Sequence, residues 1–128
     1  MRTRELGRTG CQVSIVGLGC CQLGGDWGRV DDSDAMDVLH AAVEAGVTVL
    51  DIADVYGDGR SELLIGRLSA ERPDAGLTVA TKMGRRASPH VPEAFTLQAF
   101  RNWIDRSRAN LGVEVLDLVQ LSADISVL

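Results

Sequence analysis

The sequence predicts an α/β fold in which four parallel strands alternate with three helices after a small N-terminal hairpin. Two observations predict it. Short, near-continuously apolar segments recur four times along the 128 residues, as expected for strands of a parallel sheet covered on both faces. Between them lie three longer segments whose apolar residues repeat at helical spacing. This order favours right-handed crossovers between parallel strands.

The strands are placed by their apolar segments and by the turns that flank them. A hairpin is expected over residues 3–6 and 11–14, around the turn Gly7-Arg-Thr-Gly10. The strands of the main sheet are expected at residues 15–19, 47–52, 77–82 and 115–121.

The ends of the helices are marked by residues that favour helix starts and stops. The first helix is expected from Asp32 or Ser33 to Gly46, the second from about Ser61 to before Pro73, and the third over residues 96–110, closed by Gly112. Their inward faces are expected to carry Leu39, Ala42 and Val43 in the first helix, Leu64, Ile65 and Leu68 in the second, and Leu97, Phe100, Ile104 and Leu111 in the third.

Composition limits the class of protein. The chain is expected to form one domain over residues 1–128, and its net charge of −5 argues against a nucleic-acid or anionic-membrane partner. The N-terminus has no apolar leader, and no apolar segment approaches the roughly 18 residues that a membrane span needs.

The cysteines and histidines exclude two kinds of site. Three cysteines, Cys11 and the adjacent pair Cys20 and Cys21, form no disulfide framework, so a reducing cytoplasm is the expected location. No two of them have the C-x-x-C spacing, and only His40 and His90 could help to bind a metal. We therefore expect no metal site.

Three reactive side chains follow strand ends, where barrel-type α/β enzymes keep their chemistry. Asp51 ends the second main strand, Tyr56 follows it, and Lys82 ends the third. An ammonium beside a tyrosine stabilises the phenolate, and a carboxylate keeps the lysine charged and oriented. Such a group could protonate a carbonyl oxygen as hydride arrives, or could serve enolisation or elimination without a redox step.

Several motifs together carry a resemblance to a known family. They are Leu6-Gly-Arg-Thr-Gly10, Gly17-Leu-Gly19, Gln22-Leu-Gly-Gly-Asp-Trp-Gly28, Asp51-Ile-Ala-Asp-Val-Tyr-Gly57, Ser61-Glu62, Ile65-Gly66, Ala80-Thr-Lys82 and Leu116-Asp-Leu-Val-Gln-Leu121. Over residues 3–121 the chain resembles the aldo-keto reductases. The resemblance implies a (β/α)8 TIM barrel that reduces aldehydes and ketones with NADPH through an Asp-Tyr-Lys-His tetrad.

By this resemblance Asp51 is the tetrad aspartate, Tyr56 the proton donor and Lys82 the assisting lysine. The sequence departs from the family pattern where the histidine is expected, because Ser122 stands there. Serine can donate a hydrogen bond to a carbonyl oxygen but cannot act as an imidazole, and we include Ser122 among the candidate catalytic residues. Relatives usually carry an aromatic residue at the position of Cys21, the second of the two adjacent cysteines. The substrate pocket is therefore expected to differ from that of the relatives.

Other residues are candidates for substrate binding. Trp27 lies in the loop after the first main strand, Asp54 lies between the tetrad positions, and Arg85 follows Lys82. Either Arg85 or its neighbour Arg86 could bind an anionic group. The segment Gly17-Leu-Gly-Cys-Cys-Gln22 lacks the third glycine of a dinucleotide fingerprint, so we interpret it as a tight strand exit.

The length predicts half a barrel, since a complete one needs about 250 residues. The family's main phosphate- and adenine-binding segments belong to the other half. Half a barrel leaves two strand edges unpaired, so we expect a homodimer that covers them, unless the sheet forms a small open α/β domain.

Three functions stay open at this point. The first is NADPH-dependent carbonyl reduction of a small molecule, with Tyr56 as proton donor assisted by Lys82 and Asp51, which the lone chain is not expected to carry out by itself. The second is acid–base catalysis without a cofactor, such as isomerisation, dehydration or cyclisation, in a half-barrel homodimer. The third is a non-catalytic binding subunit.

Overall fold

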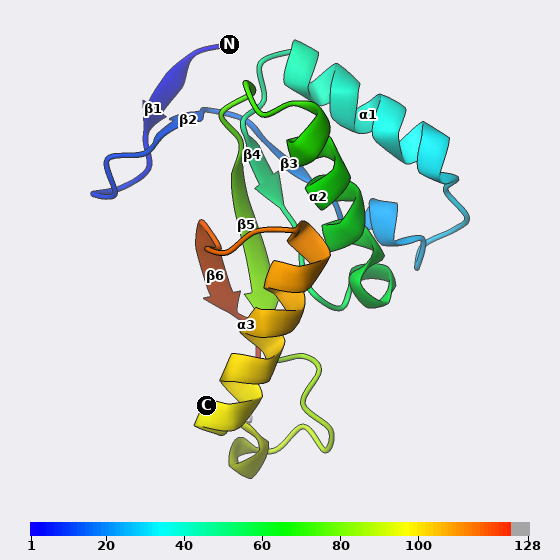
Figure 1. Ribbon diagram of the computed structural model, residues 1–128, viewed down its shortest axis with the longest axis vertical. Coiled ribbons are helices and arrows are strands. Elements are labelled where there is room, and N and C mark those ends of the chain that lie inside the picture. Colours follow the sequence, from blue (N-terminus) through cyan, green and yellow to red (C-terminus); the bar gives the residue numbers. More distant parts are fainter. Residues whose placement is uncertain (124–128) are drawn as a thin grey trace.

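A four-stranded parallel sheet forms the centre of the computed structural model, which describes residues 1–123 (Figure 1). Its strands are β3 (Gly17–Gly19), β4 (Val49–Asp51), β5 (Thr78–Met83) and β6 (Leu118–Leu121). They lie in the order β3-β4-β5-β6, and every neighbouring pair is parallel. The predicted α/β class with four parallel strands and three helices is thus confirmed.

Three helices cover one face of this sheet (Figure 1): α1 (Asp32–Glu44), α2 (Arg60–Glu71) and α3 (Leu97–Leu111). Side chains alternate along a strand, so every second strand residue faces the helices. Leu50 and Ile52 do so and are fully buried, together with Leu39 of α1 and Ile65 of α2. We call the opposite face of the sheet the inner face.

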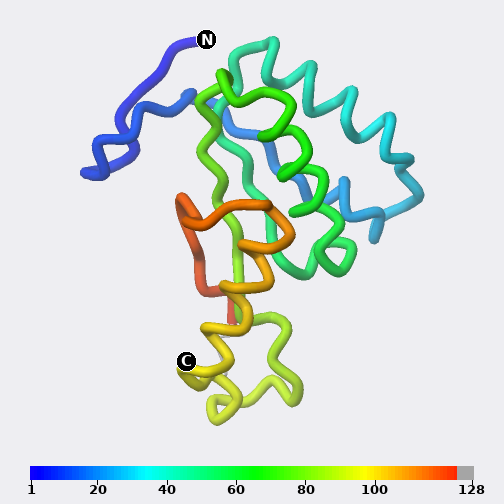
Figure 2. Tube along the Cα trace, viewed as in Figure 1, coloured from blue at the N-terminus to red at the C-terminus, as the bar shows by residue number. Residues whose placement is uncertain are grey.

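The hairpin of β1 (Thr3–Glu5) and β2 (Gln12–Ser14) lies at the amino-terminal ends of the main strands (Figure 2). Ser14 and Thr48 join it to the sheet: each backbone N–H donates to the other's side-chain oxygen, at 2.9 Å. This end of the sheet is therefore closed by backbone and hydroxyl groups, and the loops that carry the reactive residues lie at the other end.

The loops at the carboxyl ends of the strands contain three short 3-10 helices. These are η1 (Gln22–Gly24) after β3, η2 (Tyr56–Gly59) after β4 and η3 (Pro92–Ala94) after β5. Tyr56 thus stands on a tight turn directly beyond the strand that ends in Asp51.

The third helix and the fourth strand of the main sheet each differ from the sequence prediction in one respect. Leu97 was expected to face inward, and this is wrong: it is 65% exposed, because the start of α3 extends beyond the sheet (Figure 1). At that end Phe100 packs against Phe95 and Trp103, with ring centroids 6.3 and 5.7 Å away. The predicted strand over residues 115–121 begins only at Leu118, and Val115 is 78% exposed before it.

The other strands and helices agree with the prediction to within a few residues. Across residues 1–123, no helix combines the length and apolar character that a membrane crossing requires.

Candidate active site

Asp51 and Lys82 meet on the inner face at the carboxyl ends of β4 and β5. Asp51 pairs in register with Ala80, and Lys82 lies two residues further along β5, hence on the same face. The Lys82 Nζ donates to Asp51 Oδ1 at 2.7 Å and to the Ile52 carbonyl oxygen at 2.9 Å. It also lies 5.5 Å from the centroid of the Tyr56 ring. The structure therefore brings together the three residues expected to form the site.

The ion pair between Asp51 and Lys82 is partly buried, which strengthens the attraction between its charges. The Lys82 side chain is 19% exposed and that of Asp51 is 47% exposed. Charges in such a partly buried position interact more strongly than they would in open water. The ammonium is therefore held in a fixed place beside the phenol ring.

The turn that carries Tyr56 is fixed by an unusually close backbone contact with the loop after β3. A Cβ atom on Gly57 would lie 2.2 Å from the Gly24 carbonyl oxygen, and one on Gly24 would lie 2.6 Å from the Gly57 nitrogen. Gly57 also has a φ of +59°, which favours glycine. Its N–H donates to Asp26 Oδ2 at 3.0 Å. Two loops far apart in sequence therefore pack as one unit.

Arginine side chains attach the same turn to β5 and α3. Asp58 Oδ1 accepts a hydrogen bond from Arg86 and another from Arg106, the latter at 3.0 Å. Arg106 also donates to the Asp58 and Asp54 carbonyl oxygens, at 2.8 and 3.3 Å. The loop after β5 and helix α3 therefore both hold this turn.

Asp54 lies inside this arginine network and is only 1% exposed. Its Oδ2 is 3.6 Å from Arg86 Nε. Burial raises the pKa of its carboxyl from 3.8 to about 6, against the opposing effect of Arg86. The carboxyl group thus faces the protein interior and not the solvent, and its surroundings indicate a role in holding the loop rather than in contacting a substrate.

A cavity of 330 Å³ lies beside Tyr56, and we call it the Tyr56 cavity. Its lining residues are Cys21, Asp26, Trp27, Val55, Tyr56 and Arg85. Trp27 is 79% exposed at its mouth. The cavity thus contains the proposed proton donor and two of the three residues that we expected to bind substrate, Trp27 and Arg85.

A second cavity, of 480 Å³, adjoins the first at Arg85, and we call it the Ser122 cavity. The described residues that line it are Arg85, His90, Ser122 and Ala123. The Ser122 N–H donates to the Met83 carbonyl oxygen at 2.7 Å, which places this residue beyond the end of β5. Ser122 and Tyr56 therefore line neighbouring cavities rather than the same one.

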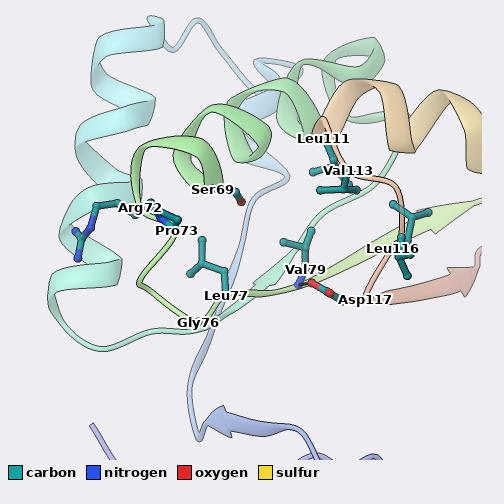
Figure 3. A pocket seen from close by; sticks show the side chains of 11 residues that line it. Ser69, Arg72, Pro73, Gly76, Leu77, Val79, Leu111, Val113, Leu116 and Asp117 are labelled. Carbon is teal, nitrogen blue, oxygen red and sulfur yellow. Dashed lines mark hydrogen bonds between the residues drawn. The ribbon is translucent and has the colours of Figure 1, made fainter.

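A third cavity lies near the amino-terminal ends of β5 and β6, away from these residues (Figure 3). This groove of 260 Å³ is bordered by the start of β5 and by the segment between α3 and β6. Leu77, Val79 and Val113 supply apolar surface, and Asp117 Oδ2 accepts the Val79 N–H at 2.9 Å. It shares no residue with the other two cavities.

Sequence reasoning missed Asp26 and the contact between Gly24 and Gly57. Both glycines and Asp26 stand inside the motifs that carried the resemblance. The contact between the two loops is long-range, however, and no regular spacing in the sequence predicts it. Within residues 1–123, no group of three His, Cys, Asp or Glu side chains could hold a metal ion.

Curated relatives match most of this chain. Pyridoxal 4-dehydrogenase from Microbacterium luteolum is 42% identical over 96 residues, which are 71% of this chain and 28% of that protein. The 6-dehydroglucose reductase of Novosphingobium aromaticivorans is 36% identical over 126 residues, or 92% of this chain and 40% of that protein. The chain therefore spans well under half the length of these relatives.

Solved structures share the fold. The aldo-keto reductase AKR11C1 from Bacillus halodurans, in its holo form, superposes with a TM-score of 0.75 at 27% identity, over 94% of this chain and 40% of that one. For the glycerol dehydrogenase AKR11B4 from Gluconobacter oxydans the TM-score is 0.74 at 30% identity, over 93% and 38% of the two chains. The four-stranded sheet and its helices thus correspond to part of a (β/α)8 barrel. The profile of the aldo/keto reductase family matches residues 15–125, and the chain belongs to that family.

Proposed function

We propose that this chain supplies the proton-transfer residues for reduction of a carbonyl group by a nicotinamide cofactor, NADPH by family resemblance. The observation that carries the proposal is the arrangement of Lys82, hydrogen-bonded to Asp51 and to the Ile52 carbonyl oxygen, beside the Tyr56 ring. Family membership and the relatives' names, a dehydrogenase and a reductase, support oxidoreduction.

Each residue has a separate task in this reaction. The Tyr56 hydroxyl donates its proton to the carbonyl oxygen of the substrate and becomes a phenolate. The Lys82 ammonium stabilises that negative charge from beside the ring. Asp51 prevents Lys82 from turning away, through the 2.7 Å hydrogen bond.

The inner face at this end of the sheet fits the hydride donor. Bound NADPH would supply hydride to the carbonyl carbon, so its nicotinamide must approach the same carbonyl group that Tyr56 protonates. Asp51 and Lys82 are the residues that would meet it, since Asp51 is 47% exposed on that face. Tyr56, Asp51 and Lys82 would therefore orient the reacting ends of the cofactor and substrate.

The test is substitution of the proton donor. Tyr56→Phe removes only the hydroxyl, so carbonyl reduction should fall by about 10²–10⁴-fold, the usual contribution of a general acid. The measurement is NADPH oxidation with a panel of aldehydes, and circular dichroism verifies that the variant is folded. An unchanged rate would exclude Tyr56 as the donor.

A parallel assay without nucleotide separates the alternatives. Tyr56 and Lys82 can transfer protons but not hydride. Turnover that needs no nucleotide and is lost in Tyr56→Phe would therefore support acid–base catalysis and contradict carbonyl reduction. Tight binding of NADPH without any turnover would instead favour a binding subunit.

A further inference from the structure

Arg85 occupies a position between the two cavities at the carboxyl end of the sheet. It lines the Tyr56 cavity together with Tyr56 and Trp27, and the Ser122 cavity together with Ser122. It is exposed, in the loop that follows β5. A molecule that occupies either cavity therefore meets this guanidinium.

The other arginines at this end of the molecule already have carboxylate partners. Arg60 pairs with Asp32 at 2.5 Å, and Arg86 and Arg106 both pair with Asp58. Arg85, in contrast, has no hydrogen bond or ion pair with any residue among 1–123. Of two adjacent arginines, the structure thus uses Arg86 to hold the loop and leaves the donors of Arg85 for a ligand.

We propose that the carbonyl substrate carries an anionic group, a carboxylate or a phosphate ester, and that Arg85 binds it. This inference rests on the proposed function, because the carbonyl end is placed at Tyr56. A guanidinium presents its N–H groups in a planar fork that matches two oxygens of a carboxylate or phosphate. The proposal makes Arg85 a residue that determines substrate specificity.

The charges around Arg85 indicate on which side the anion binds. Asp26 lines the Tyr56 cavity, and its Oδ2 accepts the Gly57 N–H at 3.0 Å. This carboxylate repels an anion inside that cavity. The Ser122 cavity is lined by Ser122 and by His90, whose ring packs edge-on against Phe95 at 5.4 Å, and the described lining residues include no carboxylate. The substrate therefore extends from Tyr56 past Arg85, with its anionic end toward Ser122.

The loop offers a clean substitution for testing this. Arg86 anchors the loop through Asp54 and Asp58, so truncation of Arg85 leaves the fold intact. Arg8, an exposed residue in the hairpin turn at the other end of the sheet, provides a control with the same change in net charge.

The experiment compares the binding of para-formylbenzoate and its methyl ester, which share one aldehyde and differ in charge. Isothermal titration calorimetry is done without nucleotide, so the result does not depend on turnover. The wild-type chain should bind the acid roughly tenfold more tightly than the ester, as a charge-assisted hydrogen bond would give. Arg85→Ala should lose this preference, Arg85→Lys should retain part of it, and Arg8→Ala should keep all of it.

The outcomes distinguish this inference from the proposed function. A preference that disappears only in Arg85→Ala supports the inference even if no aldehyde is reduced. Equal binding of acid and ester by the wild type, or a preference that survives in Arg85→Ala, overturns it. A separate titration with NADPH also overturns it if Arg85→Ala weakens only that binding, since Arg85 would then contact the cofactor.

Discussion

The two adjacent cysteines after β3 differ sharply in their surroundings. Cys20 is fully buried, and burial raises the pKa of its thiol to about 12, with a smaller effect of Asp51 in the same direction. Cys21 is partly buried and lines the Tyr56 cavity. Of this pair only Cys20 is therefore enclosed by the core, because Cys21 reaches the cavity.

The difference predicts selective alkylation. Since the thiolate is the reactive form, iodoacetamide should modify the exposed Cys11 in the native protein and leave Cys20 unmodified. Peptide mass spectrometry measures the sites, and labelling in urea provides the control, because unfolding makes all three thiols accessible. Native labelling of Cys20 as fast as that of Cys11 would contradict the prediction.

At the scale of elements, the contact between η1 and η2 determines where Tyr56 stands. Gly24→Ala places a methyl group 2.6 Å from the Gly57 nitrogen and 2.8 Å from the Tyr56 carbonyl carbon. Both neighbours are backbone atoms that cannot rotate away, so we expect a loss of about 1–3 kcal/mol in the free energy of unfolding. The displaced tyrosine should also lower kcat for carbonyl reduction.

The matched control for Gly24→Ala is Gly19→Ala in β3, because a Cβ atom there meets nothing within 4 Å. Urea unfolding of both variants measures the effect. Equal stability of the two would show that the loops separate easily and that their contact does not position Tyr56.

The burial of Asp54 predicts a pH dependence of stability. The pKa of Asp54 is raised from 3.8 to about 6, so the folded protein keeps a proton there that the unfolded chain has lost. The stabilisation from this group is fully present below 3.8 and is lost as the pH rises through about 6.

Urea unfolding of wild type and Asp54→Asn between these pH values measures this contribution. The stability of wild type relative to the variant should be greatest at the acidic end and should decrease through about pH 6. A difference that stays constant across this window would show that Asp54 does not titrate there.

At the scale of the whole molecule, the inner face and the sheet edges are the surfaces least covered by the described residues. β3 and β6 are the outer strands of the sheet, and Leu118 and Leu121 of β6 are 38% and 48% exposed. Unpaired strand edges beside apolar surface favour association. We therefore expect two copies of this chain to associate through these edges.

Sedimentation velocity over a dilution series measures this association. Leu118→Glu introduces a charge on β6 and should shift the chain toward monomer. Leu97→Glu, at an equally apolar but more exposed site on α3, should leave the association unchanged. A wild-type chain that is monomeric at every concentration contradicts the expectation.

The sequence was informative where local patterns determine structure. Apolar segments and capping residues placed the strands and helices, and parallel strands bring their carboxyl ends to one edge, so Asp51, Tyr56 and Lys82 could be grouped before any coordinates. The contrast between Arg85 and Arg86 could not be predicted, because neighbouring loop residues differ only in which distant carboxylates they reach. Leu97 was misplaced because helical spacing does not show where the sheet beneath a helix ends.

The two hydrogen bonds of Lys82 limit the number of further acceptors to which its ammonium can donate. A lysine ammonium carries three hydrogens, and here Asp51 Oδ1 and the Ile52 carbonyl oxygen accept two of them. Rotation about the Cε–Nζ bond would break both bonds at once, so the direction of the third N–H is fixed. Lys82 can therefore donate to only one further acceptor at a time.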